Sequence, residues 1–142
     1  MIRLAPEPRA AIAAHAELDF PNEACGLLLG RRDGDAVLIT EAVASENIAD
    51  EPAHRFEIDP GLRLRLQKAA RQGGGDVVGH YHSHPNGAAR PSDTDRAGIF
   101  EVDLIWLIAA VKAGRLEQIA AYQPWAGGGG FDDVVLRTDR AV

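Results

Sequence analysis

The sequence predicts an α/β protein with a mixed or antiparallel sheet flanked by about three helices, and three observations lead to this class. The 142 residues suffice for one hydrophobic core, and we expect residues 1–142 to form a single compact domain. Short apolar runs rich in branched residues alternate with segments in which apolar residues recur at helical spacing. Turn residues separate these segments, and no internal repeat or linker divides the chain.

Three segments are expected to be helical: apolar residues recur at helical spacing in the first two, and Ser92 and Asp95 mark the start of the third. The second of them follows Asp59 and Pro60, which resemble an N-cap residue and a proline at the first helical position. The expected helices run from about Pro6 to Leu18, from Pro60 to the glycines at 73–75, and from Ser92 to about Glu101.

Strands are expected where apolar runs are short and bounded by turn residues. The run Leu27–Leu29 is typical of a strand buried on both faces, and the Asp33–Gly34 turn returns the chain as its hairpin partner. The strands are expected at Leu27–Leu29, Ala36–Ala44, His54–Ile58, Asp76 to the histidines, Asp103–Val111, Leu116–Tyr122 and Phe131–Arg137. Gly127–Gly130 is expected to be a flexible loop.

Composition excludes several classes of function. The formal net charge of −6, with no basic stripe, argues against a nucleic-acid partner. No apolar run has the length of a membrane span, and the N-terminal residues lack the pattern of a secretory signal. The single cysteine excludes an intrachain disulfide and a multi-cysteine zinc site. Cytoplasmic is therefore the default expectation for its location.

The stretch from Gly79 to Asp95 holds the candidate metal ligands. His82 and His84 are two residues apart, so in an extended strand both side chains point to the same face, with α-carbons about 6–7 Å apart. A loop could bring Asp95 back as a third ligand. Two histidines and one carboxylate, with a position left for water, are typical of a catalytic zinc site. A lone buried histidine is more often a core residue, but this pair beside an aspartate favours a metal.

Asp95 also has a structural interpretation. Ser92 and Asp95 have the spacing of a capping box, in which Ser92 is the N-cap residue of a helix. An acidic residue in the first turn also suits the helix dipole. The two roles are compatible, since a capped helix start fixes the direction of the carboxylate.

The complete pattern resembles the signature of the JAMM (MPN-plus) metalloprotease family. It consists of His82-Ser83-His84, seven residues, Ser92, two residues and Asp95. Leu18–Gly30 is similar to the family's first motif, and Phe56–Pro60 resembles the stretch before the second helix in prokaryotic JAB-domain proteins. The resemblance extends over about residues 1–110. It implies the JAB/MPN fold, which is related to that of the cytidine deaminases.

The resemblance also implies a role for each residue of the motifs. His82, His84 and Asp95 would bind Zn²⁺, Glu23 would be the general acid and base, and Ser92 would stabilise the oxyanion. These roles agree with general chemistry, because zinc lowers the pKa of bound water to about 7 and a neighbouring carboxylate can accept its proton. Glu23 is selected by the resemblance alone.

The activity implied is zinc-dependent hydrolysis of an amide or isopeptide bond after the C-terminal Gly-Gly tail of a small ubiquitin-like or sulfur-carrier protein. One alternative is a zinc peptidase that acts on small peptides or cell-wall fragments. The non-enzymatic alternative, an MPN-type scaffold, is disfavoured because every ligand position is filled. Nucleotide deamination would require a pair of cysteine ligands, which a chain with one cysteine cannot supply.

Four other residues are candidates for supporting roles. His80 could be a fourth ligand if its strand is regular, but it is expected to be a core residue or to support the site, because a fourth protein ligand would close the open position. Cys25 lies near Glu23 and could act as a nucleophile with a histidine, but it is expected to be a buried thiol. Trp106 is expected in the core, whereas Trp125 could line either a loop or a substrate groove.

Overall fold

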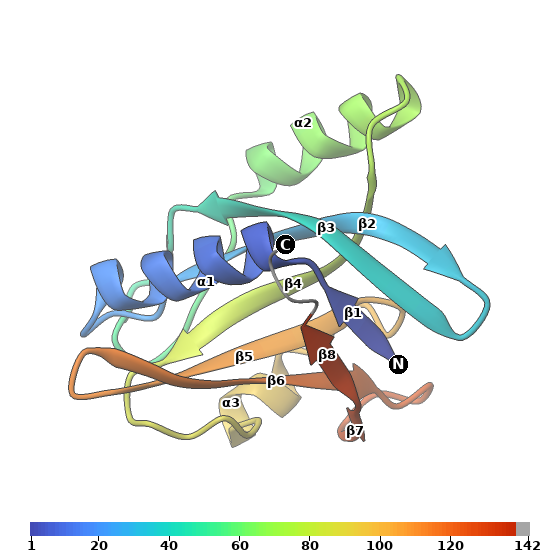
Figure 1. Cartoon of the computed structure of the whole chain (residues 1–142). Helices are drawn as coiled ribbons and strands as arrows, with labels where there is room; N and C mark the ends of the chain where they lie inside the picture. The colour runs from blue at the N-terminus through green and yellow to red at the C-terminus, as the bar shows by residue number, and fades with distance from the viewer. Residues whose placement is uncertain (139–142) are drawn as a thin grey trace.

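The computed structural model describes residues 1–138, which form one mixed sheet and three helices (Figure 1). The elements are β1 (Ile2–Leu4), α1 (Pro6–Asp19), β2 (Cys25–Asp33), β3 (Ala36–Ser45), α2 (Pro60–Arg71), β4 (Asp76–His84), α3 (Asp93–Ala97), β5 (Ile105–Lys112), β6 (Arg115–Pro124), β7 (Phe131–Val134) and β8 (Leu136–Thr138). The predicted fold class, a mixed sheet with three helices, is confirmed.

The strands of the described chain follow the order β7-β6-β5-β4-β2-β3-β1-β8. β4 runs parallel to β5, and β1 runs parallel to both β3 and β8, while the other neighbours are antiparallel. β7 and β8 are separated by Val135 alone, yet they lie at opposite ends of this order. The Ile2 amide donates a hydrogen bond to the Val135 carbonyl at 2.8 Å. The sheet is therefore curved, and one segment, residues 131–138, contributes the outermost strand at each end of it.

The two faces of the sheet carry different clusters. Ile12 and Ala16 of α1 share a core cluster with Leu107 and the other odd-numbered residues of β5. Trp106 of β5 belongs to a second cluster, as expected for side chains that alternate along a strand. His80 pairs with Trp106 across the β4–β5 ladder. The histidines of β4 therefore lie on the face opposite α1, where His80 lines a pocket together with residues of α2, α3 and the segment that connects β3 to α2.

The third helix is shorter than predicted. It ends at Ala97, and the Gly98 amide bonds back to the carbonyls of Thr94 and Asp95 at 3.1 and 3.0 Å. Glycine disfavours continuation of a helix, which explains why the predicted end at Glu101 is wrong.

Three differences concern strands. The predicted strand His54–Ile58 is wrong, because only Ile58 makes a bridge, with Asn47. The predicted last strand is divided at Val135 into β7 and β8. β1 was not predicted, since three residues are too few for a periodic pattern.

The start of α2 agrees with the prediction. The side chain of Asp59 accepts a hydrogen bond from the Gly61 amide at 3.0 Å, and Pro60 occupies the first helical position. In the described part of the chain, each helix is too short or too polar to cross a membrane.

Candidate active site

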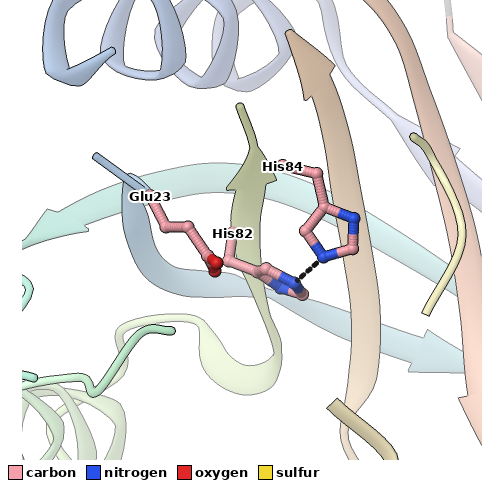
Figure 2. A group of neighbouring side chains, drawn as sticks. All are labelled: Glu23, His82 and His84. Carbon is pink, nitrogen blue, oxygen red and sulfur yellow. Dashed lines mark hydrogen bonds between the residues drawn. The ribbon is translucent and has the colours of Figure 1, made fainter. Parts of the chain in front are cut away.

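Two buried histidines at the end of β4 face one another. The Nε2 atoms of His82 and His84 lie 2.9 Å apart (Figure 2). The carboxylate of Asp95, from α3, completes the group: Oδ1 is 3.2 Å from His82 Nε2 and Oδ2 is 3.0 Å from His84 Nε2. The structure thus brings together all three predicted metal ligands on the face opposite α1.

The predicted capping box is what directs Asp95 toward the histidines. The Asp95 amide donates to Ser92 Oγ at 3.0 Å, and the Ser92 amide donates to Asp95 Oδ2 at 2.9 Å. The same Oδ2 atom faces His84. Helix capping and the ligand position are therefore achieved by one side-chain orientation, as the sequence predicted.

Two of these three groups are held in the protonation state that metal binding requires. Burial would raise the pKa of Asp95, but hydrogen bonds with His82 and His84 lower it well below its usual value, so the carboxylate is ionised. Burial lowers the pKa of His82, although Asp95 opposes this effect. Burial also disfavours the charged form of His84, but the hydrogen bond and charge of Asp95 outweigh it and raise the pKa. An ionised carboxylate and a neutral imidazole are the forms that bind metals, so His84 has to be deprotonated when a metal binds.

His84 has a second contact that orients its ring. Its Nδ1 donates to the Ala88 carbonyl at 2.7 Å, which holds the ring so that Nε2 is directed toward Asp95 and His82. Metal-binding histidines commonly donate their other ring nitrogen in this way.

The spacing of the three ligand atoms also fits a metal. A tetrahedral zinc ion with bonds of about 2.0–2.1 Å would separate its ligand atoms by about 3.3 Å. The observed separations of 2.9 to 3.2 Å are close to that value. His82, His84 and Asp95 could therefore hold a metal ion with little movement.

Glu23 lies beside this group, directly before β2 (Figure 2). One of its carboxylate oxygens is within 4.8 Å of ligand nitrogens of His82 and His84. The residue is only 6% exposed, and Oε1 has no hydrogen-bond partner among the described residues. Burial raises the pKa of Glu23 to about 7, with the charge of His84 opposing and that of Asp95 adding to the rise. A carboxyl group with this pKa can both accept and release a proton near neutral pH.

The backbone around Glu23 is fixed from two sides. The Ala24 amide donates to Ser83 Oγ at 2.7 Å, and the Ser83 amide donates to the Ala24 carbonyl at 2.9 Å. The Glu23 amide donates to the Pro52 carbonyl at 2.7 Å. Ser83, between the two histidines, thus ties Glu23 to the strand that carries them.

Asn47 is a supporting residue that sequence reasoning did not find. Its amide nitrogen donates to the carbonyls of Glu23 at 2.9 Å and Arg55 at 3.0 Å. Its Oδ1 accepts from the amides of Ala49 and Glu57 at 3.1 and 3.0 Å. One side chain therefore holds the connection between β3 and α2 against the backbone of Glu23. An asparagine in a polar loop has no periodic or motif signal that would have identified it.

Phe56 on the same connection was not assigned a role either. Its ring stacks on that of His82, with centroids 4.3 Å apart and planes 18° from parallel. Phe56 restricts the rotation of His82, so the connection supports both Glu23 and a candidate ligand.

The remaining candidates lie outside the ligand group. The ring of His80 packs against Trp106 with centroids 4.4 Å apart, and its pKa falls to about 3 because of burial first and His82 second. Cys25 is buried, and burial raises the pKa of its thiol to about 12, with Asp19 adding to the rise. A thiol in this state is a poor nucleophile. Trp106 is in the core, as predicted, whereas Trp125 is half exposed in the loop after β6.

The fold and these side chains define an α/β protein with a candidate metal site and a buried carboxyl group beside it. The model of the prokaryotic homologs of the JAB domain matches residues 7–123 of the chain. The chain therefore belongs to this family, and the resemblance noted from its motifs is confirmed.

Two relatives and one solved structure extend this finding. The chain is 37% identical over 113 residues to a desampylase of Haloferax volcanii, a match that covers 77% of this chain and 80% of the relative. It is 28% identical over 113 residues to a CysO-cysteine peptidase of Mycobacterium tuberculosis, covering 80% of this chain and 75% of the relative. The solution structure of a protein from Desulfitobacterium hafniense aligns with a TM-score of 0.81 at 32% identity, covering 98% of this chain and 94% of that one.

Proposed function

We propose that this protein is a zinc-dependent hydrolase that cleaves the amide or isopeptide bond after the C-terminal Gly-Gly tail of a small ubiquitin-like or sulfur-carrier protein. The observation that carries the proposal is the unpartnered Oε1 of Glu23 beside the closely spaced His82, His84 and Asp95. The names of the desampylase and the CysO-cysteine peptidase support the substrate class. We further propose that the chain works as one domain in the cytoplasm.

His82, His84 and Asp95 are the proposed zinc ligands, since their atoms are spaced as such ligands require. When bound, zinc would polarise the substrate carbonyl and lower the pKa of water, which supplies a nucleophile near neutral pH. His84 remains oriented by the Ala88 carbonyl throughout.

Glu23 is the proposed general base and general acid. Its ionised carboxylate accepts a proton from the attacking water, and the protonated carboxyl then gives this proton to the departing amine. A pKa of about 7 makes both transfers accessible at neutral pH. The hydrogen bonds to Pro52, Asn47 and, through Ala24, to Ser83 hold the backbone that carries the carboxylate in place during the cycle.

Ser92 is the proposed oxyanion donor. Its Oγ accepts the Asp95 amide, which leaves the hydroxyl hydrogen free to donate to substrate. Loss of one such donor commonly lowers the rate by about 10²–10³.

The test combines zinc analysis with cleavage of a Gly-Gly carrier conjugate. Glu23→Gln should keep its zinc and lose at least about 10²-fold in turnover, because only the proton transfers are removed. His84→Ala should lose both zinc and turnover. Retained turnover in Glu23→Gln, or a wild-type protein that binds no zinc when purified without chelator, would refute the proposal.

A further inference from the structure

One loop connects the two halves of the proposed metal site. β4 ends at His84, and residues 85–91 lead from there to Ser92, whose capping box directs Asp95. The same loop supplies the Ala88 carbonyl, which accepts the hydrogen bond from His84 Nδ1. The course of residues 85–91 therefore affects the positions of two candidate ligands.

The first half of this loop is shaped by bonds between near neighbours. The Gly87 amide donates to the His84 carbonyl at 3.3 Å, and the Ala88 amide donates to Asn86 Oδ1 at 3.1 Å. Both distances are long, and Asn86 is exposed, so water competes for its side chain. These bonds leave the second half of the loop, residues 89–91, without support.

Tyr122 of β6 holds the loop at its midpoint. Its hydroxyl donates to the Ala89 carbonyl at 2.5 Å, although β5 lies between β6 and the strand that carries the histidines. Tyr122 is 8% exposed, so the bond is largely protected from water. Among the described residues, it is the only hydrogen bond between residues 85–91 and a strand other than β4.

The packing of Tyr122 directs its hydroxyl toward the loop. Tyr122 pairs with Trp106 and shares a cluster with it, on the face of the sheet that carries the histidines. Its ring also packs edge-on against Phe131, with centroids 6.1 Å apart. Burial raises the pKa of the hydroxyl, with Asp133 adding to the rise and Arg90 opposing it. The hydroxyl therefore stays protonated at neutral pH and remains able to donate.

We propose that Tyr122 is a positioning residue for His84, because its hydroxyl holds the loop whose Ala88 carbonyl orients the imidazole ring. The proposal rests on the proposed function, in which His84 is a zinc ligand. Tyr122 acts through one residue of the backbone: its bond fixes the Ala89 carbonyl, and the adjoining Ala88 carbonyl accepts from His84 Nδ1.

Loss of this hydroxyl should release the second half of the loop. Ala89 is half-buried, so its carbonyl can turn toward water, and the Ala88 carbonyl can move with it. The His84 ring would then lose its fixed orientation, and zinc binding would have to restore that orientation at a cost in affinity. Loss of a group that bonds directly to a metal-binding histidine commonly lowers metal affinity by about 10–100-fold. Because Tyr122 acts one residue further away, we expect a loss of about tenfold, at the lower end of this range.

The experiment is a zinc titration of the wild type and Tyr122→Phe in competition with a chromophoric chelator. Phenylalanine keeps the ring that packs in the cluster and removes only the donor. We expect the zinc Kd to rise by about tenfold in Tyr122→Phe. The Tm of the metal-free variant should fall by only about 2–7 °C, as loss of one hydrogen bond allows, which shows that the variant is folded. An unchanged Kd would overturn the proposal.

Tyr81→Phe is the matched control. It removes the other tyrosine hydroxyl of the sheet, which is hydrogen-bonded to His15 Nδ1 at 2.7 Å on the face toward α1. Its Tm should fall by a similar amount, while its zinc Kd should stay near that of the wild type. An equal rise in Kd for both variants would show that a general loss of rigidity weakens zinc binding, and it would also overturn the proposal.

The Nδ1 proton of His84 provides a readout that depends on neither zinc nor turnover. Because it is bonded to the Ala88 carbonyl, it should exchange slowly with water in the metal-free wild type, as measured by NMR of the imidazole groups. Exchange should be faster in Tyr122→Phe and unchanged in Tyr81→Phe. Equal rates in Tyr122→Phe and the wild type would refute the positioning role. A wild type that binds no zinc would instead refute the proposed function, and the exchange rates would still test the link between Tyr122 and His84.

Discussion

Replacement of Asn47 by alanine should lower the stability of the protein and leave Glu23, its proposed general base, less firmly positioned. The side chain makes five hydrogen bonds: four of 2.9 to 3.1 Å, to Glu23, Arg55, Ala49 and Glu57, and a longer one of 3.4 Å to the Pro52 carbonyl. Each such bond contributes about 0.5–1.5 kcal/mol, and part of this connection is accessible to water that can replace them. We therefore expect Asn47→Ala to lower the free energy of unfolding by about 2–4 kcal/mol.

For a chain of this length, that loss corresponds to a decrease in Tm of about 6–15 °C. Turnover should fall as well, because a shift of about 1 Å in a catalytic group can cost about 10²-fold. The measurements are urea unfolding, thermal melting, and kcat on a Gly-Gly carrier conjugate well below the lowered Tm. Zinc content should stay near that of the wild type, since Asn47 contacts none of the three proposed ligands in the described structure.

Two further variants make this prediction specific. Asn47→Asp keeps the acceptor for the Ala49 and Glu57 amides and loses the donor to Glu23, so it should recover part of the stability and little of the turnover. Gln118→Ala removes an exposed amide from β6 and should change stability by less than about 0.5 kcal/mol. Normal turnover in a destabilised Asn47→Ala protein would show that Asn47 does not position Glu23.

Three more predictions follow from buried groups near the site. Ser83→Ala leaves the buried Ala24 amide without its partner at 2.7 Å and should cost about 1–3 kcal/mol in urea unfolding; a loss below 0.5 kcal/mol would contradict this. In the metal-free protein the pKa of Glu23 rises from 4.5 to about 7, so the native state holds the extra proton between these pH values and loses stability as the pH rises through them. The free energy of unfolding of Glu23→Gln should therefore be higher than that of the wild type, by an amount that grows from near zero at pH 4.5 to about 2–3 kcal/mol above pH 7. A pH-independent difference between the two would refute the assigned pKa. Because burial raises the pKa of the Cys25 thiol to about 12, iodoacetamide at pH 8 should leave it unmodified in the native protein, as mass spectrometry would show, and rapid alkylation would contradict its burial.

The parts of the fold that the sequence predicted well are those governed by local patterns. The capping residue Asp59, followed by Pro60, marks the start of α2 because both act within one turn of the chain. The buried run at 27–29 marks β2 because a strand covered on both faces must be apolar throughout. β1 was not predicted, because its stability comes from pairing with residues 37–39 and 136–138, which are distant in sequence.

The residues of the candidate site also differ in whether local sequence patterns predict them. His82, His84 and Asp95 could be inferred from strand periodicity and a capping pattern, and the structure places them together. Glu23 required a family resemblance, because its position depends on long-range hydrogen bonds such as that with Asn47. Phe56 was assigned to a strand that does not form, and its stacking on His82 depends on the course of an irregular connection.

The segment that pairs with β6 through Phe131–Val134 and with β1 through Leu136–Thr138 also limits how another chain can attach to the sheet. Extended peptides often bind by adding a strand to an open sheet edge, and long open edges also promote aggregation. In the described chain, the outer edges belong to β7 and β8, which are four and three residues long. β4, which carries the histidines, already has neighbours on both sides. An extended tail that reached His82 and His84 would therefore not be held as an added strand beside β4, and its partners would have to come from the segments around the site.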